Sequence, residues 1–126
     1  MMIFVFGSNE SGIHGAGAAR VALKEHGAQP MVGFGPQGNS FAIPTKSWDI
    51  DGTLPLEIIR VYVDSFKRYA RMEMQLKQFQ VTRIGCGLAG LKDKDIAPMF
   101  SDAPLNCLFD EAWKPFLPTA KFWGTF

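Results

Sequence analysis

The chain has 126 residues, of which 47% are hydrophobic and 20% are charged, and its net charge is +1. A chain of this length forms one domain, and a near-neutral charge argues against a nucleic-acid-binding protein, which carries a basic excess. No apolar run approaches the ~20 residues that cross a membrane, and the two cysteines give neither a disulfide framework nor a metal-binding spacing. We therefore expect a cytoplasmic protein with a single domain over 1–126 and no metal.

Strands and helices are predicted to alternate along the chain. Residues 2–6 form a short apolar run that is typical of a buried strand, and the alanine-rich stretch 16–27 favours a helix. Residues 31–34 and 40–44 predict two more short strands, and a polar loop is expected over 45–53.

The longest helix is predicted to begin near Pro55, a residue favoured in the first turn. Apolar residues recur after it at spacings of three and four, which places them on one helix face: Ile59, Tyr62, Phe66 and Tyr69. The rest of the chain predicts a strand, a short helix and a last strand, over 79–84, 93–100 and 106–109. This alternation indicates an α/β domain with a parallel or mixed sheet.

Ten of the 13 glycines lie in three segments, 7–17, 33–38 and 85–90, close to predicted strands. Glycine at this density marks loops, and loops without side chains let a ligand reach the backbone. Exposed N–H groups and helix N-termini attract phosphates. Ligands of α/β sheets bind at the carboxyl ends of the strands. If their strands run parallel, we expect all three segments to meet there with Thr45 and Lys46.

Two common nucleotide-binding motifs are absent. Residues 15–20 nearly give the dinucleotide pattern G-x-G-x-x-G, but Arg20 stands in place of the third glycine, and there is no G-K-[ST]. The candidate side chains are therefore those within and beside the loops. Asn9 is expected either to bind a ligand hydroxyl or to cap its own loop. Lys46 is expected to reach a phosphate, to act as a nucleophile, or to be an ordinary surface lysine.

Three further residues are candidates for acid–base or nucleophilic chemistry. His14 has a reference pKa near neutrality, so it could contact a phosphate or act as an acid or base; the alternative is an exposed histidine without function. Cys86 either packs beneath a tight loop or is a nucleophile with His14 as its base. Asp93 either complements the dipole of a helix that begins there, or acts as an acid or base.

Residues 110–126 are an aromatic C-terminal extension with five large rings: Trp113, Phe116, Phe122, Trp123 and Phe126. Core packing of a returning tail is one interpretation. The other is the interface of a homodimer, since exposed apolar patches of this kind are contact surfaces.

Several stretches resemble macrodomains of the terminal ADP-ribose glycohydrolase type. The run 81–88, VTRIGCGL, is similar to the PRIGCGL segment of that family. Residues 40–46 are similar to its strand that ends in Thr-Lys, and residues 15–19 to its GAGIA turn, with agreeing order and spacing. The stretches VFGSN, HGAGAA, IPTK and RIGCGLAG also resemble a set of uncharacterised bacterial and phage proteins. The resemblance covers roughly residues 2–100 and leaves out the aromatic extension.

The resemblance implies a three-layer α/β/α macrodomain with a mixed central sheet that binds ADP-ribose. By it, the first loop and helix start hold the adenosine and pyrophosphate, and the loop 85–90 wraps the diphosphate and the distal ribose. In hydrolytic members, a lysine at the Lys46 position attacks the distal ribose, and an aspartate directly after GCGL assists. That position is Ala89 here, and Asp93 could replace the aspartate only if the loop folds back. The implied ligand-binding residues are Gly7, Ser8, Asn9, Gly15, Ala16, Gly17, Thr45, Gly85, Cys86, Gly87, Leu88, Ala89 and Gly90.

We therefore expect a protein that binds ADP-ribose or a related nucleotide diphosphate, with an ADP-ribosylated protein as a further candidate partner. Hydrolysis of ADP-ribosyl or ADP-ribose phosphate groups stays open, with Lys46, His14 and Asp93 as its catalytic residues. The alternative is a non-enzymatic module that binds or sequesters a nucleotide or a protein. No cofactor is expected in either case.

Overall fold

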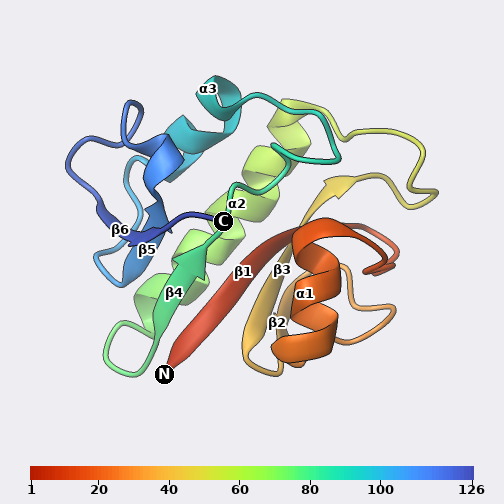
Figure 1. Ribbon diagram of the computed structural model, residues 1–126, viewed down its shortest axis with the longest axis horizontal. Helices are drawn as coiled ribbons and strands as arrows, with labels where there is room; N and C mark the ends of the chain where they lie inside the picture. Colours follow the sequence, from red (N-terminus) through yellow and green to blue (C-terminus); the bar gives the residue numbers. More distant parts are fainter.

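The computed structural model describes residues 1–126 and contains a six-stranded mixed sheet with helices on both faces (Figure 1). This confirms the predicted α/β class and its layered α/β/α arrangement. Given their length and polarity, none of the helices could span a membrane. The elements in chain order are β1 (Met2–Asn9), α1 (Gly17–Glu25), β2 (Gly35–Gln37), β3 (Ser40–Lys46), α2 (Leu56–Met72), β4 (Gln78–Val81), α3 (Asp93–Ile96), the 3-10 helix η1 (Ala97–Phe100), β5 (Cys107–Asp110), the 3-10 helix η2 (Glu111–Trp113) and β6 (Lys121–Gly124).

Most of the sheet is parallel, so the carboxyl ends of its strands share one edge. The order across the sheet is β2-β3-β1-β4-β5-β6, and β1 pairs in parallel with both β3 and β4. The pairs β4–β5 and β5–β6 are also parallel, whereas β2 is antiparallel to β3. The carboxyl ends of β1, β3, β4, β5 and β6 therefore meet along the edge where sheets of this kind bind ligands.

Alternate residues of β1 supply two hydrophobic cores, one on each face of the sheet. Ile3 and Val5 join a cluster of 19 buried residues that includes the apolar face of α2. Phe4 and Phe6 join a cluster of 6 that includes Ala19 and other alanines at α1. Figure 1 shows the two helices on opposite faces, with α1 in front and α2 behind. Packing against the α1 face brings the N-terminus of α1 close to the ends of the strands.

The other predicted elements agree with the structure except at some of their ends, whereas the strand predicted over 31–34 is absent and β6 was not predicted. Helix α2 begins directly after Pro55, and its predicted face packs on the sheet, with Ile59 and Phe66 fully buried. Strand β3 continues through Pro44, which sequence reasoning placed at a strand end. Proline is tolerated there because β2 pairs only with Ser40–Ala42, so one side of β3 lacks a ladder partner at this point.

The strand predicted over 31–34 is wrong. Met31 has a φ of 71°, in the left-handed region, so the chain turns there instead of extending. Gly33 packs so closely against the preceding loop that an added Cβ would lie 2.3 Å from the carbonyl oxygen of Asn9. This close tertiary contact fixes the segment as a turn, and the strand begins only at Gly35.

The aromatic segment 110–126 packs back onto the sheet. The indole of Trp113 is fully buried in the larger core, and β6 extends the sheet beyond β5. Trp123 Nε1 donates a hydrogen bond of 2.9 Å to the carbonyl of Val81 in β4. These contacts agree with core packing of a returning tail. Phe116 and Phe126 stay exposed.

Candidate functional site

A cleft of about 500 Å³ lies at the carboxyl edge of the sheet, between the N-terminus of α1, the loop that follows β4, and the end of the chain. Every ligand-binding residue that the sequence predicted lines this cleft, except Gly90. Lys46 lines it as well, whereas His14 and Asp93 do not. The parallel strands thus bring together residues from positions 7 to 126 of the chain.

Only two of the three glycine segments reach the cleft. The first and third touch each other, because an added Cβ on Gly7 would lie 3.1 Å from the backbone nitrogen of Gly85. The middle segment does not line the cleft, because the condition of that expectation, parallel strands, is not met for it. Its strand β2 is antiparallel to the others, which puts its carboxyl end at the opposite edge, where Gly38 packs on Gly27.

The N-terminus of α1 lines the cleft with residues whose backbone N–H groups are unpaired. The first hydrogen bond of this helix runs from the Arg20 N–H to the Ala16 carbonyl, so the N–H groups of Gly17, Ala18 and Ala19 have no acceptor in the structure. No side chain caps the helix, and its first turn contains no acidic residue. Unpaired donors at a positive dipole end favour an anion.

A second row of N–H groups comes from the loop after β4. Four backbone hydrogen bonds shape this loop, from Ile84 to Thr82, from Cys86 to Arg83, from Gly90 to Gly87, and from Leu91 to Gly85. None of them uses the N–H groups of Gly87, Leu88 and Ala89, which also lack other acceptors while their residues line the cleft. Two segments of the cleft lining therefore have unpaired donors, and such donors suit a phosphate or diphosphate.

Lys46 ends β3 at one end of the cleft. Its side chain is half-buried, and its Nζ makes no hydrogen bond or ion pair within the chain. The backbone carbonyl of Lys46 accepts a hydrogen bond from the Glu10 N–H, which ties the lysine to the first loop. An ammonium group without an internal partner can neutralise an anion held by the two rows of N–H groups.

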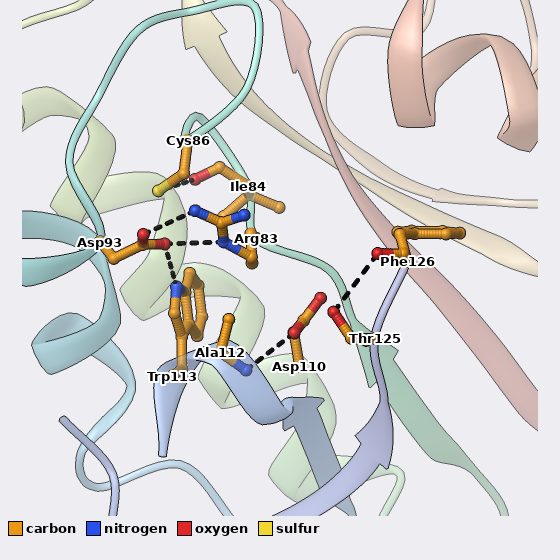
Figure 2. Close-up of polar contacts among 9 residues, drawn as sticks. All are labelled: Arg83, Ile84, Cys86, Asp93, Asp110, Ala112, Trp113, Thr125 and Phe126. Carbon is orange, nitrogen blue, oxygen red and sulfur yellow. Dashed lines mark hydrogen bonds and ion pairs between the residues drawn. The ribbon is translucent and has the colours of Figure 1, made fainter. Parts of the chain in front are cut away.

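Asp93 lies outside the cleft and holds the loop from behind (Figure 2). Its carboxylate accepts hydrogen bonds of 2.9 and 2.6 Å from Arg83 and one of 2.6 Å from Trp113 Nε1. The hydrogen bonding by Arg83 lowers the pKa of the Asp93 carboxyl, although partial burial opposes this. Both oxygens of the Asp93 carboxylate are therefore occupied, by the Arg83 guanidinium and the Trp113 indole. The pair with Arg83 holds the two ends of the loop 83–93 together.

The Cys86 thiol lines the cleft but is poorly suited to act as a nucleophile. Burial and the nearby Asp93 carboxylate raise its pKa to about 12, so the thiol is neutral at physiological pH. Its Sγ donates to the carbonyl of Ile84 at 3.5 Å, and no contact joins it to His14. The hypothesis of a Cys86–His14 nucleophile and base therefore has no support in the geometry.

His14 is buried, with 4% of its surface exposed, and its ring makes hydrogen bonds to several segments. Its Nε2 lies 2.9 Å from the carbonyl of Gln29 and 3.2 Å from Oε1 of Gln37, and both of these oxygens are acceptors. Nε2 must therefore carry the proton, which leaves Nδ1 to accept the Ser8 hydroxyl at 2.7 Å. This network fastens the first loop to the segment before β2. The burial contradicts the exposed histidine that sequence reasoning considered. A phosphate contact or an acid–base role stays a prediction, for a residue that does not line the cleft.

Asn9 shapes the first loop with its own amide. Its Oδ1 accepts hydrogen bonds from the Ile13 N–H at 2.9 Å and the Ser11 hydroxyl at 2.8 Å. Its Nδ2 donates to the Ile13 carbonyl at 2.8 Å. This is the local capping that the sequence offered as one of two readings of Asn9. By holding the loop closed, Asn9 positions the start of α1 beside the cleft.

Sequence reasoning missed several residues of the cleft: Ile13, Ala18, Ala19, Ile50, Thr82, Arg83, Ile84, Asp110, Thr125 and Phe126. Asp110 directly follows the predicted last strand, and the same signal had singled out Lys46. No local signal marks the apolar rim, which consists of Ile13, Ile50, Leu88 and Phe126 with exposed fractions of 50%, 38%, 70% and 72%.

The cleft thus combines a polar floor with an apolar rim. Unpaired N–H groups and Lys46 favour an anion at its centre and at one end, while exposed apolar side chains offer contacts for a flat ring. The chain matched no protein family, no curated protein and no solved structure in comparisons with known proteins. No group of His, Cys, Asp and Glu side chains is arranged to hold a metal ion.

Proposed function

We propose that this protein is a cytoplasmic macrodomain-like protein that binds ADP-ribose or a related nucleotide diphosphate in the cleft. The observation that carries the proposal is the two rows of unpaired N–H groups in the cleft lining, at residues 17–19 of α1 and 87–89 of the loop after β4. Two rows of backbone donors suit the two phosphates of a diphosphate better than a single carboxylate. The central position of these rows leaves room for an organic group on either side.

The order of the strands supports a ligand with groups on both sides of a diphosphate. Lys46 ends β3, the N–H rows lie beside the ends of β1 and β4, and Phe126 follows β6. Four strand spacings separate β3 from β6, which is roughly 19 Å along the edge. This length suits an extended molecule with a base at one end and a second sugar at the other, such as ADP-ribose.

Binding without turnover is the better supported form of this function. Lys46 has no carboxylate beside it in the cleft, because the position after GCGL is Ala89 and Asp93 is bound to Arg83 and Trp113. The one acidic side chain that lines the cleft is that of Asp110 at the end of β5, three strand spacings or roughly 14 Å from β3. An attack by the Lys46 amine would therefore lack an adjacent acid or base.

Titration calorimetry with ADP-ribose, ADP and inorganic diphosphate tests the proposal. We expect ADP-ribose to bind more tightly than ADP, and diphosphate to bind weakest. Lys46→Ala should lower the affinity for ADP-ribose about tenfold, which corresponds to ~1.4 kcal/mol. The matched control is Lys94→Ala, because Lys94 is exposed on α3 and outside the cleft. Absence of binding for all three compounds at millimolar concentration would refute the proposal.

Turnover is measured separately, by release of ADP-ribose from an ADP-ribosylated peptide. We expect no release above the uncatalysed rate. Release that the wild-type protein catalyses and the Lys46→Ala variant does not would show that the hydrolytic alternative is right, and that Lys46 needs no carboxylate neighbour.

A further inference from the structure

A groove of about 270 Å³ lies on α2, the helix that covers the face of the sheet opposite α1 (Figure 1). It runs between the helix and the turn that follows η1, and every residue that lines it is charged: Arg60, Asp64, Lys67, Arg68, Arg71 and Asp102. None of these residues lines the cleft, so the groove is a separate site. A hollow with an excess of cations concentrates anions from solution.

Lys67 ties the two walls of the groove together. Its side chain is 7% exposed, and its Nζ donates a hydrogen bond of 2.8 Å to the carbonyl of Met99. The same Nζ lies 2.6 Å from Oδ1 of Asp102 and 3.1 Å from Oδ1 of Asp64. An ammonium group has three donors, and three acceptors surround this one. Lys67 is therefore satisfied within the chain, and it holds both carboxylates of the groove.

Arg68 keeps its positive charge because the nearest carboxylate along the helix is already taken. Arg68 lies four residues after Asp64, a spacing at which opposite charges commonly pair on a helix. The Asp64 carboxylate lies against Lys67 instead. The one internal hydrogen bond of the Arg68 guanidinium is to the neutral Ser65 hydroxyl, at 3.0 Å.

The other two arginines of the groove are also without a carboxylate partner. Arg71 donates to the backbone carbonyl of Asp102 at 3.3 Å, and Arg60 makes no hydrogen bond or ion pair within the chain. Arg68 and Arg71 are neighbours at a spacing of three, where like charges destabilise a helix. The three guanidinium groups thus gather beside one hollow, and no group of the chain neutralises them.

The charge of the groove matches that of a phosphate monoester. The three arginines contribute +3, and Lys67 with its two carboxylates contributes −1, which leaves a net charge of +2. A phosphate monoester carries close to −2 above its second pKa of about 6. Guanidinium groups also fit phosphate geometrically, because they donate parallel pairs of hydrogen bonds to its oxygens. A single carboxylate would bring half of this charge.

We propose that this groove binds a phosphate monoester as its dianion, with Arg68 and Arg71 donating to the phosphate oxygens and Arg60 approaching from the other end. Arg60 lies two helical turns, or about 12 Å, from Arg68, so it makes the more distant contact. The proposal does not rest on the function proposed for the cleft. The same phosphate group occurs on small phosphorylated compounds and on phosphorylated serine side chains.

Titration with phenyl phosphate of protein labelled with ¹⁵N at arginine tests the proposal, observed at the side-chain Nε–H signals. We expect saturable shifts at Arg60, Arg68 and Arg71. Arg68→Ala should weaken the affinity about tenfold. Arg68→Lys keeps the charge but loses the planar pair of donors, so its affinity should lie between the two. The matched control is Arg20→Ala, which removes the same charge from an exposed position outside the groove and the cleft and should leave the affinity unchanged.

The pH dependence separates recognition of the dianion from a general attraction of anions. No histidine or cysteine lines the groove, and the hydrogen bond from Lys67 lowers the pKa of the Asp102 carboxyl, which therefore stays ionised between pH 5 and pH 7. The ligand gains a proton over this range. The affinity for phenyl phosphate should therefore fall from pH 7 to pH 5, whereas sulfate, a dianion at both pH values, should bind equally well at each.

Three results would overturn the proposal. Chloride at the same ionic strength could reproduce the shifts, which would show screening of surface charge and no site. Arg68→Ala could bind phenyl phosphate as tightly as Arg20→Ala. Shifts could occur at Arg83 alone, which lines the cleft and would place the phosphate there.

The source of the phosphate is identified by a second ligand, a short peptide with one phosphoserine. If the groove binds phosphate monoesters, this peptide shifts the same three arginine signals. Binding tighter than that of phenyl phosphate indicates a phosphorylated protein as the partner, and equal binding indicates a small phosphorylated compound. A phosphoserine peptide that leaves the three signals unchanged contradicts recognition of the phosphate group itself.

Discussion

At the scale of single residues, Gly85 has the tightest local requirement in the loop after β4. Its φ is +76°, and an added Cβ would lie 2.7 Å from Cδ1 of Leu91 and 3.2 Å from Cγ2 of Thr45. We expect Gly85→Ala to lower the free energy of unfolding by at least about 1–2 kcal/mol, since the left-handed conformation alone costs that much. Gly87→Ala is the control, because Gly87 has no positive φ and no atom within 4 Å of an added Cβ. Equal stability of both variants in urea would contradict this account of the loop.

The ion pair of Asp93 makes a prediction about acid stability. Because the folded state lowers the pKa of Asp93 below its ordinary value of 3.8, the unfolded state binds a proton more readily. The stabilisation is complete above pH 3.8 and is lost as the pH falls through the lower, folded pKa. Asp93→Asn should therefore reduce the loss of stability between pH 4 and pH 2. Part of that loss remains in the variant, because the hydrogen bond from Lys67 also lowers the pKa of Asp102. Asp51→Asn, at an exposed position, is the control; an unchanged pH profile for Asp93→Asn would be evidence against the ion pair.

At the scale of elements, helix stability and anion binding favour different residues in the first turn of α1. Helix stability favours an acidic residue there, and α1 has none, whereas anion binding favours a bare N-terminus. Ala18→Asp should therefore raise the free energy of unfolding by about 0.3–1 kcal/mol, yet weaken ADP-ribose binding at least tenfold. Ala18→Asn, a neutral side chain of the same shape, is the control and should change the affinity far less. Ala18→Asp with unaltered affinity would show that the anion does not lie at this helix.

Elements were predictable from the sequence where local pattern and tertiary packing agree. The buried faces of α2 and β1 follow directly from their apolar periodicity. The segment 31–34 was not predictable, because its turn depends on the close contact of Gly33 with Asn9 and on the positive φ of Met31. Neither feature can be recognised from the amino-acid composition of residues 31–34.

At the scale of the whole molecule, the location of the site was predictable because parallel strands share one carboxyl edge. That rule gathers the first and third glycine segments and Lys46 in one cleft. The direction of β2 and the burial of His14 could not be predicted from the sequence, because both depend on which segments pack together. Asp110 and Phe126 were missed because they belong to the site only once β6 lies beside β5 and returns the chain end to the cleft.

The central claim is that a diphosphate binds between the N–H groups of residues 17–19 and those of residues 87–89. Titration of ¹⁵N-labelled protein with ADP-ribose, followed by amide chemical shifts, tests it most directly because these donors are the atoms observed. The account predicts that the largest shifts occur at both rows and that inorganic diphosphate moves the same amides. Saturable shifts confined to another face, such as the basic surface of α2 around Arg60 and Arg68, or no shifts at millimolar ADP-ribose, would contradict it.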